Sequence, residues 1–125
     1  MNSNKFSLKS RFGSFKFAFH GLWSLLKNEH NSRIHFLAAI IAIVMGLVLK
    51  INFLEWPLLI IVIGIVFLTE LLNTSLETLG DLVDPEWNER VRKAKDYAAA
   101  AVLISAIISI VVGGLIFIPK ILNLI

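Results

Sequence analysis

Four side chains that carry oxygen atoms recur at helical spacing in the middle of the sequence. They are Glu70, Asn73, Glu77 and Asp81, separated by three, four and four residues. An α-helix turns about 100° per residue, so it places all four within an arc of about 80°. Carboxylates on one helix face can accept a proton or hold a hard cation such as Mg²⁺, which also binds phosphate oxygens. The spacing therefore predicts a site of proton-transfer or metal–phosphate chemistry.

Three more charged residues could serve this chemistry. Lys95 and Asp96 directly precede an apolar stretch, and Glu29 follows an amphipathic one. Lys95 could neutralise a transferring phosphate, or it could be an interfacial lysine whose ammonium reaches water. The sequence contains neither the common glycine-rich phosphate loops nor an H-R-D catalytic loop. A nucleotide would therefore have to be held in another way.

The composition is that of a membrane protein. Of the 125 residues, 57% are hydrophobic and 17% are charged, whereas soluble domains have about 45–50% apolar and about 25% charged residues. Stretches without charge recur along the chain, so we predict a single all-α integral membrane domain. The absence of cysteine excludes disulfides, thiolate metal centres and a cysteine nucleophile.

Four helices are expected to carry these residues. Apolar and basic side chains recur every three or four positions over residues 8–28, which predicts an N-terminal amphipathic helix at the membrane interface. Membrane spans are predicted at 33–50, at 55–82 and within a helix at 85–118. Asp84-Pro85 is expected to begin that last helix, and Pro119-Lys120 to end it. No cleaved signal peptide is expected, because no apolar segment precedes Ile34.

The basic residues are distributed unequally about these spans. Only Lys50 and Lys120 are expected on the side of the turn between the first two spans. The other ten are Lys5, Lys9, Arg11, Lys16, Lys27, Arg33, Arg90, Arg92, Lys93 and Lys95. Cytoplasmic segments carry such an excess, so we expect the N-terminus and the acidic face on the cytoplasmic side. Because the charges stand beside the spans, they favour anionic lipid headgroups over nucleic acid as partners.

The acidic face should run from lipid to water. If Trp56 marks the outer interface, an upright helix places Glu70 about 21 Å, Glu77 about 31 Å and Asp81 about 37 Å away, across a hydrocarbon layer of about 30 Å. An ionisable group at the depth of Glu70 is costly, so it predicts a functional site. The alternative is a structural carboxyl that hydrogen-bonds neighbouring helices.

Two other classes of protein could contain a carboxyl at this depth. A small transporter or channel subunit would use Glu70 as a proton-coupling or ion-binding carboxyl. A transport site lies near the membrane midplane, so this reading leaves Glu77, Asp81 and the Lys95-Asp96 pair unexplained. A structural membrane anchor would leave the whole acidic face unexplained.

Several segments together resemble one known family. Glu70-Leu-Leu-Asn73-Thr-Ser-Leu-Glu77 with Asp81, followed by Ala94-Lys95-Asp96 and the run Ala98 to Leu103, resembles the signature of the prokaryotic diacylglycerol kinases, including their undecaprenol kinase branch. Gly21-Leu22, Asn28-Glu29 and Arg33-Ile34-His35 resemble the family segment that leads into the first span. The resemblance extends from about Phe15 to Lys120 and centres on a specific motif.

The resemblance implies a homotrimer of three-span subunits in a bacterial inner membrane that transfers phosphate from Mg²⁺–ATP to a lipid alcohol. It implies that Glu70 is the general base, that Glu29 and Glu77 bind the metal, and that Asn73 is a polar active-site residue. The residues implied for nucleotide binding are Glu29, Glu77, Asp81, Lys95 and Asp96.

Two segments bear on which lipid is the substrate. Tyr97-Ala98-Ala99 stands where diacylglycerol-specific members have a Gly-Ser pair after Lys-Asp, and Arg33-Ile34-His35 resembles the undecaprenol kinases. We therefore expect undecaprenol to be favoured over diacylglycerol.

Overall fold

The computed structural model describes residues 6–125, and all of its regular structure there is α-helical. The four helices are α1 (Leu8–Asn28), α2 (His30–Val48), α3 (Glu55–Val83) and α4 (Glu89–Leu122). Of these, α2, α3 and α4 are long and apolar enough to cross a membrane. The prediction of an all-α chain with three candidate spans and an additional N-terminal helix is therefore confirmed. Lys5, which entered the count of basic residues, lies outside the described part of the chain.

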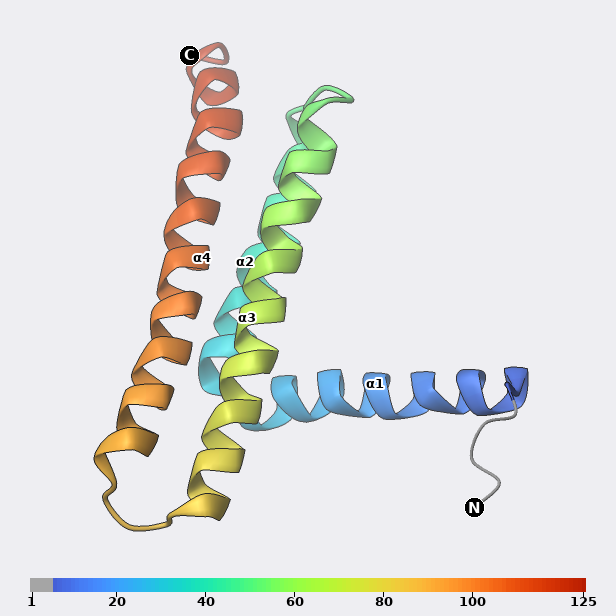
Figure 1. Cartoon of the computed structure of the whole chain (residues 1–125). Helices are drawn as coiled ribbons and strands as arrows, with labels where there is room; N and C mark the ends of the chain where they lie inside the picture. The colour runs from blue at the N-terminus through green and yellow to red at the C-terminus, as the bar shows by residue number, and fades with distance from the viewer. Residues whose placement is uncertain (1–5) are drawn as a thin grey trace.

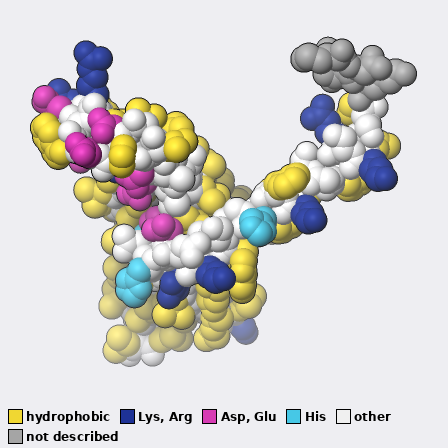
Figure 2. Space-filling view, turned by 90° about the horizontal axis from the view of Figure 1, so that it is seen from below, with side chains coloured by type: hydrophobic (Ala, Val, Ile, Leu, Met, Phe, Trp, Pro, Cys, Tyr) yellow, Lys and Arg dark blue, Asp and Glu magenta, His cyan; other side chains and the backbone are white. Residues whose placement is uncertain are grey.

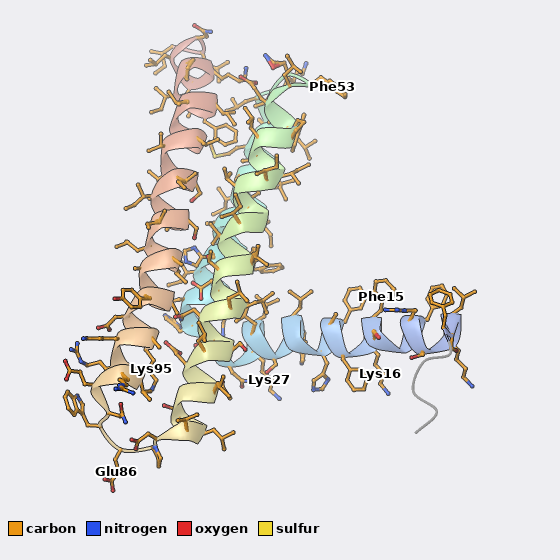
Figure 3. All side chains as sticks on the ribbon, viewed as in Figure 1. Phe15, Lys16, Lys27, Phe53, Glu86 and Lys95 are labelled. Atoms are coloured by element: carbon orange, nitrogen blue, oxygen red, sulfur yellow. The ribbon has the colours of Figure 1, made fainter. Side chains whose placement is uncertain are left out.

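Three helices form an upright bundle, and α1 extends sideways from it (Figure 1). Among the helix pairs, α3 and α4 pack together most extensively. Phe15 points from α1 towards the side on which the bundle stands, whereas Lys16 and Lys27 point the opposite way (Figure 3). An interfacial helix needs this division, with its apolar side chains towards lipid and its ammonium groups in water.

The corner between α1 and α2 is a single extended residue, Glu29, with φ −103° and ψ 114°. Arg33 secures this corner from the next helix. Its Nε and Nη2 atoms donate to the carbonyls of Leu26 and Lys27 at 2.9 and 2.7 Å. These carbonyls belong to the last turn of α1, where no intrahelical donor is available. The chain therefore turns from α1 into the bundle while both carbonyls keep a hydrogen-bond donor.

The interior of the bundle is a narrow stripe. The buried residues of α3 recur every three or four positions, and they are Leu59, Val62, Val66 and Glu70. Most of the large apolar side chains of the described residues are instead exposed. Such a surface is unfavourable in water but suits lipid or another membrane-embedded chain. Glu70 is therefore the one charged residue in this buried stripe of α3, whose other members are apolar.

The end of the bundle away from α1 is closed by tight packing. Gly46 lies against Trp56, and a Cβ at position 46 would come within 2.9 Å of the indole ring. Glu55 accepts a hydrogen bond from the backbone N–H of Asn52 at 2.9 Å, and its carboxylate lies 3.0 Å from Nζ of Lys120. These contacts join the start of α3 to the turn before it and to the end of α4.

Both expected boundaries of the last helix need correction. α4 begins at Glu89 rather than at 85, because Asn88 is its N-cap and accepts from the N–H groups of Arg90 and Val91. Asp84 instead ends α3, and its side chain accepts from Glu86 N–H and Asn88 Nδ2 within the connecting turn. The side chain of Asp84 is thus occupied by donors of the turn, and Asn88 caps α4 in its place.

Pro119 does not end α4, which continues to Leu122. The φ angle of proline is helical, and although its ring removes one hydrogen bond and crowds the preceding turn, little of the helix remains beyond Pro119 to be affected. Its carbonyl still accepts from the N–H of Asn123 at 3.2 Å. The helix therefore extends one turn beyond the boundary expected at 118.

Candidate active site at the membrane boundary

Glu70 is a buried carboxyl whose two oxygens both face α2. The residue is 4% exposed. Ser32 Oγ donates a hydrogen bond to Oε2 at 3.4 Å, and Nε2 of His35 lies 3.2 Å from Oε1. The contact with His35 is close but not aligned as a hydrogen bond, so Oε1 is a buried acceptor without one. Glu70 is thus surrounded by protein, and its Oε1 has a close contact with His35 but no aligned hydrogen bond.

Asn73 and Glu77 form a second polar group, one and two turns further along the same helix face. Asn73 Nδ2 donates to Glu77 Oε1 at 3.3 Å. Asn73 Oδ1 is buried and has no hydrogen-bond partner. An unsatisfied buried acceptor costs about 1–3 kcal/mol. Two such acceptors, on Glu70 and Asn73, stand on the predicted face, where a hydroxyl donor or a cation would satisfy them.

Asp81 and Lys95 form a third group, which bridges α3 and α4. Nζ of Lys95 makes an ion pair with Oδ1 of Asp81, and the Lys95 side chain extends from α4 towards α3 (Figure 3). Gly80 makes room for it, because a Cβ at that position would lie 3.1 Å from Cε of Lys95 and 3.0 Å from Cγ1 of Val91. The aliphatic part of Lys95 therefore lies directly on the backbone of α3.

The acidic face becomes steadily wetter along α3. Glu70 is 4% exposed, whereas the side chain of Asp81 is 68% exposed. Seen from below, acidic side chains form a row that leads towards the junction with α1, and Lys and Arg side chains follow α1 itself (Figure 2). Exposure therefore increases from Glu70 towards Asp81, which is the direction predicted from their depths along the helix.

Two of the predicted site residues are not joined to this row by side-chain bonds. Asp96 makes an exposed ion pair with Arg92 at 3.1 Å, one turn away on α4. Glu29 is half-buried at the α1–α2 corner, and its side chain has no hydrogen bond or ion pair with another residue of 6–125. Nowhere in residues 6–125 do three His, Asp or Glu side chains gather closely enough to hold a metal ion by themselves.

Sequence reasoning did not identify Ser32 and His35 as neighbours of Glu70. Both occupy one face of α2 at a spacing of three, in a helix that otherwise becomes apolar, and this was the signal that could have found them. A second missed contact is the 2.9 Å hydrogen bond between Thr69 and the buried Ser105, which links α3 to α4 beside Glu70. Such contacts depend on the relative height of two helices, which the spacing within one helix does not determine.

The fold is that of an integral membrane protein, and one face of its central helix carries polar side chains that run from a buried carboxyl to an exposed ion pair. The sequence profile of the prokaryotic diacylglycerol kinases matches residues 16–117. An undecaprenol kinase from Bacillus subtilis (strain 168) is 38% identical over 109 residues, which are 87% of this chain and 89% of that protein. A diacylglycerol kinase from Haemophilus influenzae is 36% identical over 105 residues, which are 83% and 89% of the two chains.

A diacylglycerol kinase from Synechocystis sp. is 35% identical over 112 residues, which are 89% of this chain and 64% of that protein. The chain belongs to the prokaryotic diacylglycerol kinase family. It is therefore a multi-pass membrane lipid kinase, and membership of this kinase family implies that ATP is the phosphoryl donor.

The Asp81–Lys95 ion pair should contribute little to folding. The two side chains are 68% and 35% exposed, and exposed pairs contribute about 0–1 kcal/mol. We expect Asp81→Asn and Lys95→Gln each to lower the free energy of unfolding in detergent by less than about 1 kcal/mol. Denaturant titration of both variants and of the double variant measures this. A loss above about 2 kcal/mol would mean that the pair is structural and not available to a ligand.

Proposed function

We propose that this lipid kinase transfers the γ-phosphate of Mg²⁺–ATP to the hydroxyl of a membrane lipid alcohol, with undecaprenol favoured over diacylglycerol. The observation that carries the proposal is the single helix face on which a buried carboxyl, a polar pair and an exposed ion pair follow one another. A lipid hydroxyl can approach such a face from the apolar end. A polyphosphate can approach it from the water.

Glu70 is the proposed general base. Oε1, which has no aligned hydrogen bond, would accept the proton of the lipid hydroxyl while the hydroxyl oxygen forms a bond to the γ-phosphorus. The bond from that phosphorus to the bridging oxygen breaks, and ADP leaves with the electron pair. Burial of Glu70 supports this role, because its unsatisfied acceptor atom is enclosed by helices and not by bulk water. A positioned base of this kind contributes about 10²–10⁴ in rate.

Glu77, Asn73 and Glu29 are the proposed metal site. Mg²⁺ typically takes only one or two carboxylates and keeps water and phosphate oxygens as its other ligands, so it does not require three clustered carboxylates. The unpartnered Asn73 Oδ1 is an oxygen ligand of the type that Mg²⁺ accepts. The ion would neutralise charge on the phosphates during transfer.

The pairing of α2 with α3 supports a place for Glu29 in this site. The two helices are antiparallel neighbours, and Ser32 of α2 contacts Glu70 of α3. Because the helices are antiparallel, a step back from Ser32 along the chain and a step forward from Glu70 lead in the same direction. Glu29, the N-cap of α2, and Asn73 of α3 are therefore both displaced from the Ser32–Glu70 contact towards the same end of the bundle.

The proposed nucleotide-binding residues are Lys95, Asp81 and Asp96, together with the metal carboxylates. Lys95 is bound to Asp81, so a phosphate that binds Lys95 must compete with the carboxylate of Asp81. Asp96 is carried over from the resemblance alone, and its ion pair with Arg92 would have to open.

Two features support a long lipid chain as the substrate. A cavity of about 350 Å³ lies between α2, α3 and α4, and its lining is mostly apolar and includes His35 beside Glu70. The Arg33-Ile34-His35 and Tyr97-Ala98-Ala99 segments favour undecaprenol over diacylglycerol. A competing role in ion transport gains no support from the Asn73–Glu77 and Asp81–Lys95 pairs, which lie on the water side of Glu70.

The assembly that we propose is a homotrimer with its N-terminus and acidic face in the cytoplasm. The excess of Lys and Arg on the side of α1 and the α3–α4 connection supports the orientation. The exposed apolar sides of the three candidate spans and the exposed alanines 99–101 leave surface for neighbouring subunits.

Purified protein should phosphorylate undecaprenol faster than diacylglycerol when both are offered in mixed micelles with labelled ATP. Incorporation of label into each extracted lipid, compared as kcat/KM, measures the preference. A higher kcat/KM for diacylglycerol would reverse the proposed substrate. Label in neither lipid would exclude both of them as substrates.

Glu70→Gln and Glu77→Gln should separate proton transfer from metal binding. Glu70→Gln keeps the shape of the side chain but removes the base, so we expect nearly normal Mg²⁺–ATP affinity and a loss of turnover of about 10²-fold or more. Glu77→Gln removes a metal ligand, so nucleotide affinity should fall and recover partly at high Mg²⁺. Nucleotide affinity and lipid phosphorylation are measured on both variants. Normal turnover in Glu70→Gln would contradict the assignment.

A further inference from the structure

Two side chains of α2 contact the Glu70 carboxylate, and each contacts a different oxygen. Ser32 Oγ donates to Oε2 at 3.4 Å, and Nε2 of His35 lies 3.2 Å from Oε1. Ser32 has 0% exposure and Glu70 has 4%. A hydroxyl that is completely removed from solvent needs a hydrogen-bond partner, and for Ser32 this partner is the carboxylate. Contacts at both oxygens limit rotation of the carboxylate about its last torsion.

The two contacts leave the oxygens of Glu70 unequal. Oε2 is occupied by the hydroxyl of Ser32, whereas Oε1 is a buried acceptor without an aligned hydrogen bond. His35, beside Oε1, is also part of the lining of the apolar cavity between α2, α3 and α4. Oε1 therefore stands on the side of Glu70 from which an apolar molecule with a terminal hydroxyl would approach.

We infer that Ser32 and His35 are positioning residues for phosphoryl transfer, which hold the Glu70 carboxylate so that Oε1 faces the lipid hydroxyl. The inference rests on the proposed role of Glu70 as the base. Ser32 fixes the carboxylate through Oε2, and His35 sets the direction of Oε1 from the neighbouring turn of α2. Neither side chain takes the proton from the substrate, and neither contacts the proposed nucleotide-binding residues Asp81 and Lys95.

The chain contains a matched control for Ser32. Ser105 is also buried in the bundle, with 2% exposure, and its hydroxyl also bonds a side chain of α3. Its partner is Thr69, the residue before Glu70, and not Glu70 itself. Ser32→Ala and Ser105→Ala therefore each remove a hydroxyl from a similarly buried place. The hydroxyl of Ser105 also bonds the carbonyl of Val102 at 2.7 Å, and only Ser32→Ala releases the carboxylate.

We expect Ser32→Ala to lower kcat about tenfold and to leave the KM for Mg²⁺–ATP unchanged, because misplacing a reacting group by about 1 Å costs up to about 10²-fold. Ser105→Ala should keep kcat within about twofold of the wild type under the same conditions. Unfolding in detergent is followed for both variants, so that a loss of fold is separated from a loss of positioning. Equal falls in kcat for the two variants would overturn the role of Ser32.

His35 supplies a second test that does not depend on a completely buried site, because its side chain is 26% exposed. His35→Gln keeps a polar side chain that can contact Oε1, whereas His35→Leu replaces it with an apolar one. We expect kcat to fall about tenfold in His35→Leu and to be restored at least partly in His35→Gln. Equal kcat values in the two variants would overturn the role of His35.

Comparison with Glu70→Gln separates this inference from the proposed function. If Glu70→Gln abolishes turnover while Ser32→Ala and His35→Leu retain the kcat of the wild type, the base remains and the positioning pair is wrong. If Glu70→Gln turns over normally, Glu70 is not the base and the positioning role fails with it. Adding Ser32→Ala to Glu70→Gln should cause no further loss, since the two groups act as one unit.

Discussion

The structure depends on one constraint, the cost of placing a carboxyl group between membrane-spanning helices. Acidic side chains in the hydrocarbon are rare because neither lipid nor a lone helix satisfies their oxygens. Here α2 reduces that cost with Ser32 and His35 at Glu70. The contacts that join α2 to α3 therefore include the residue that we propose as the base. The most extensive helix packing, however, is between α3 and α4.

One face of α3 also crosses the boundary between lipid and water. Glu70 is enclosed, Asn73 and Glu77 follow at successive turns, and Asp81 meets Lys95 near the end of α3. A kinase that transfers a phosphate group from a polyphosphate to a lipid must bring together two molecules that dissolve in different phases. A continuous polar stripe of this kind allows each substrate to approach from the phase in which it dissolves.

The sequence predicted the helices and the acidic face because both depend on local patterns. Apolar run length indicates spans, and a spacing of three and four places Glu70, Asn73, Glu77 and Asp81 on one face. The contacts of Ser32 and His35 with Glu70 could not be predicted in the same way, because they depend on the register between α2 and α3. The start of α4 was misplaced for a related reason: Asp84 and Asn88 are both capping residues, and the turn between them decides which one caps.

The central claim is that Glu70 is reached from the lipid and Glu77 and Asp81 from the water. Carbodiimide labelling of carboxyl groups, located by mass spectrometry, tests it most directly. An apolar carbodiimide should label Glu70, a water-soluble one should label Glu77 and Asp81, and the lipid alcohol should protect only Glu70. Labelling of Glu70 by the water-soluble reagent as fast as Asp81, or its protection by nucleotide but not by lipid, would contradict the account.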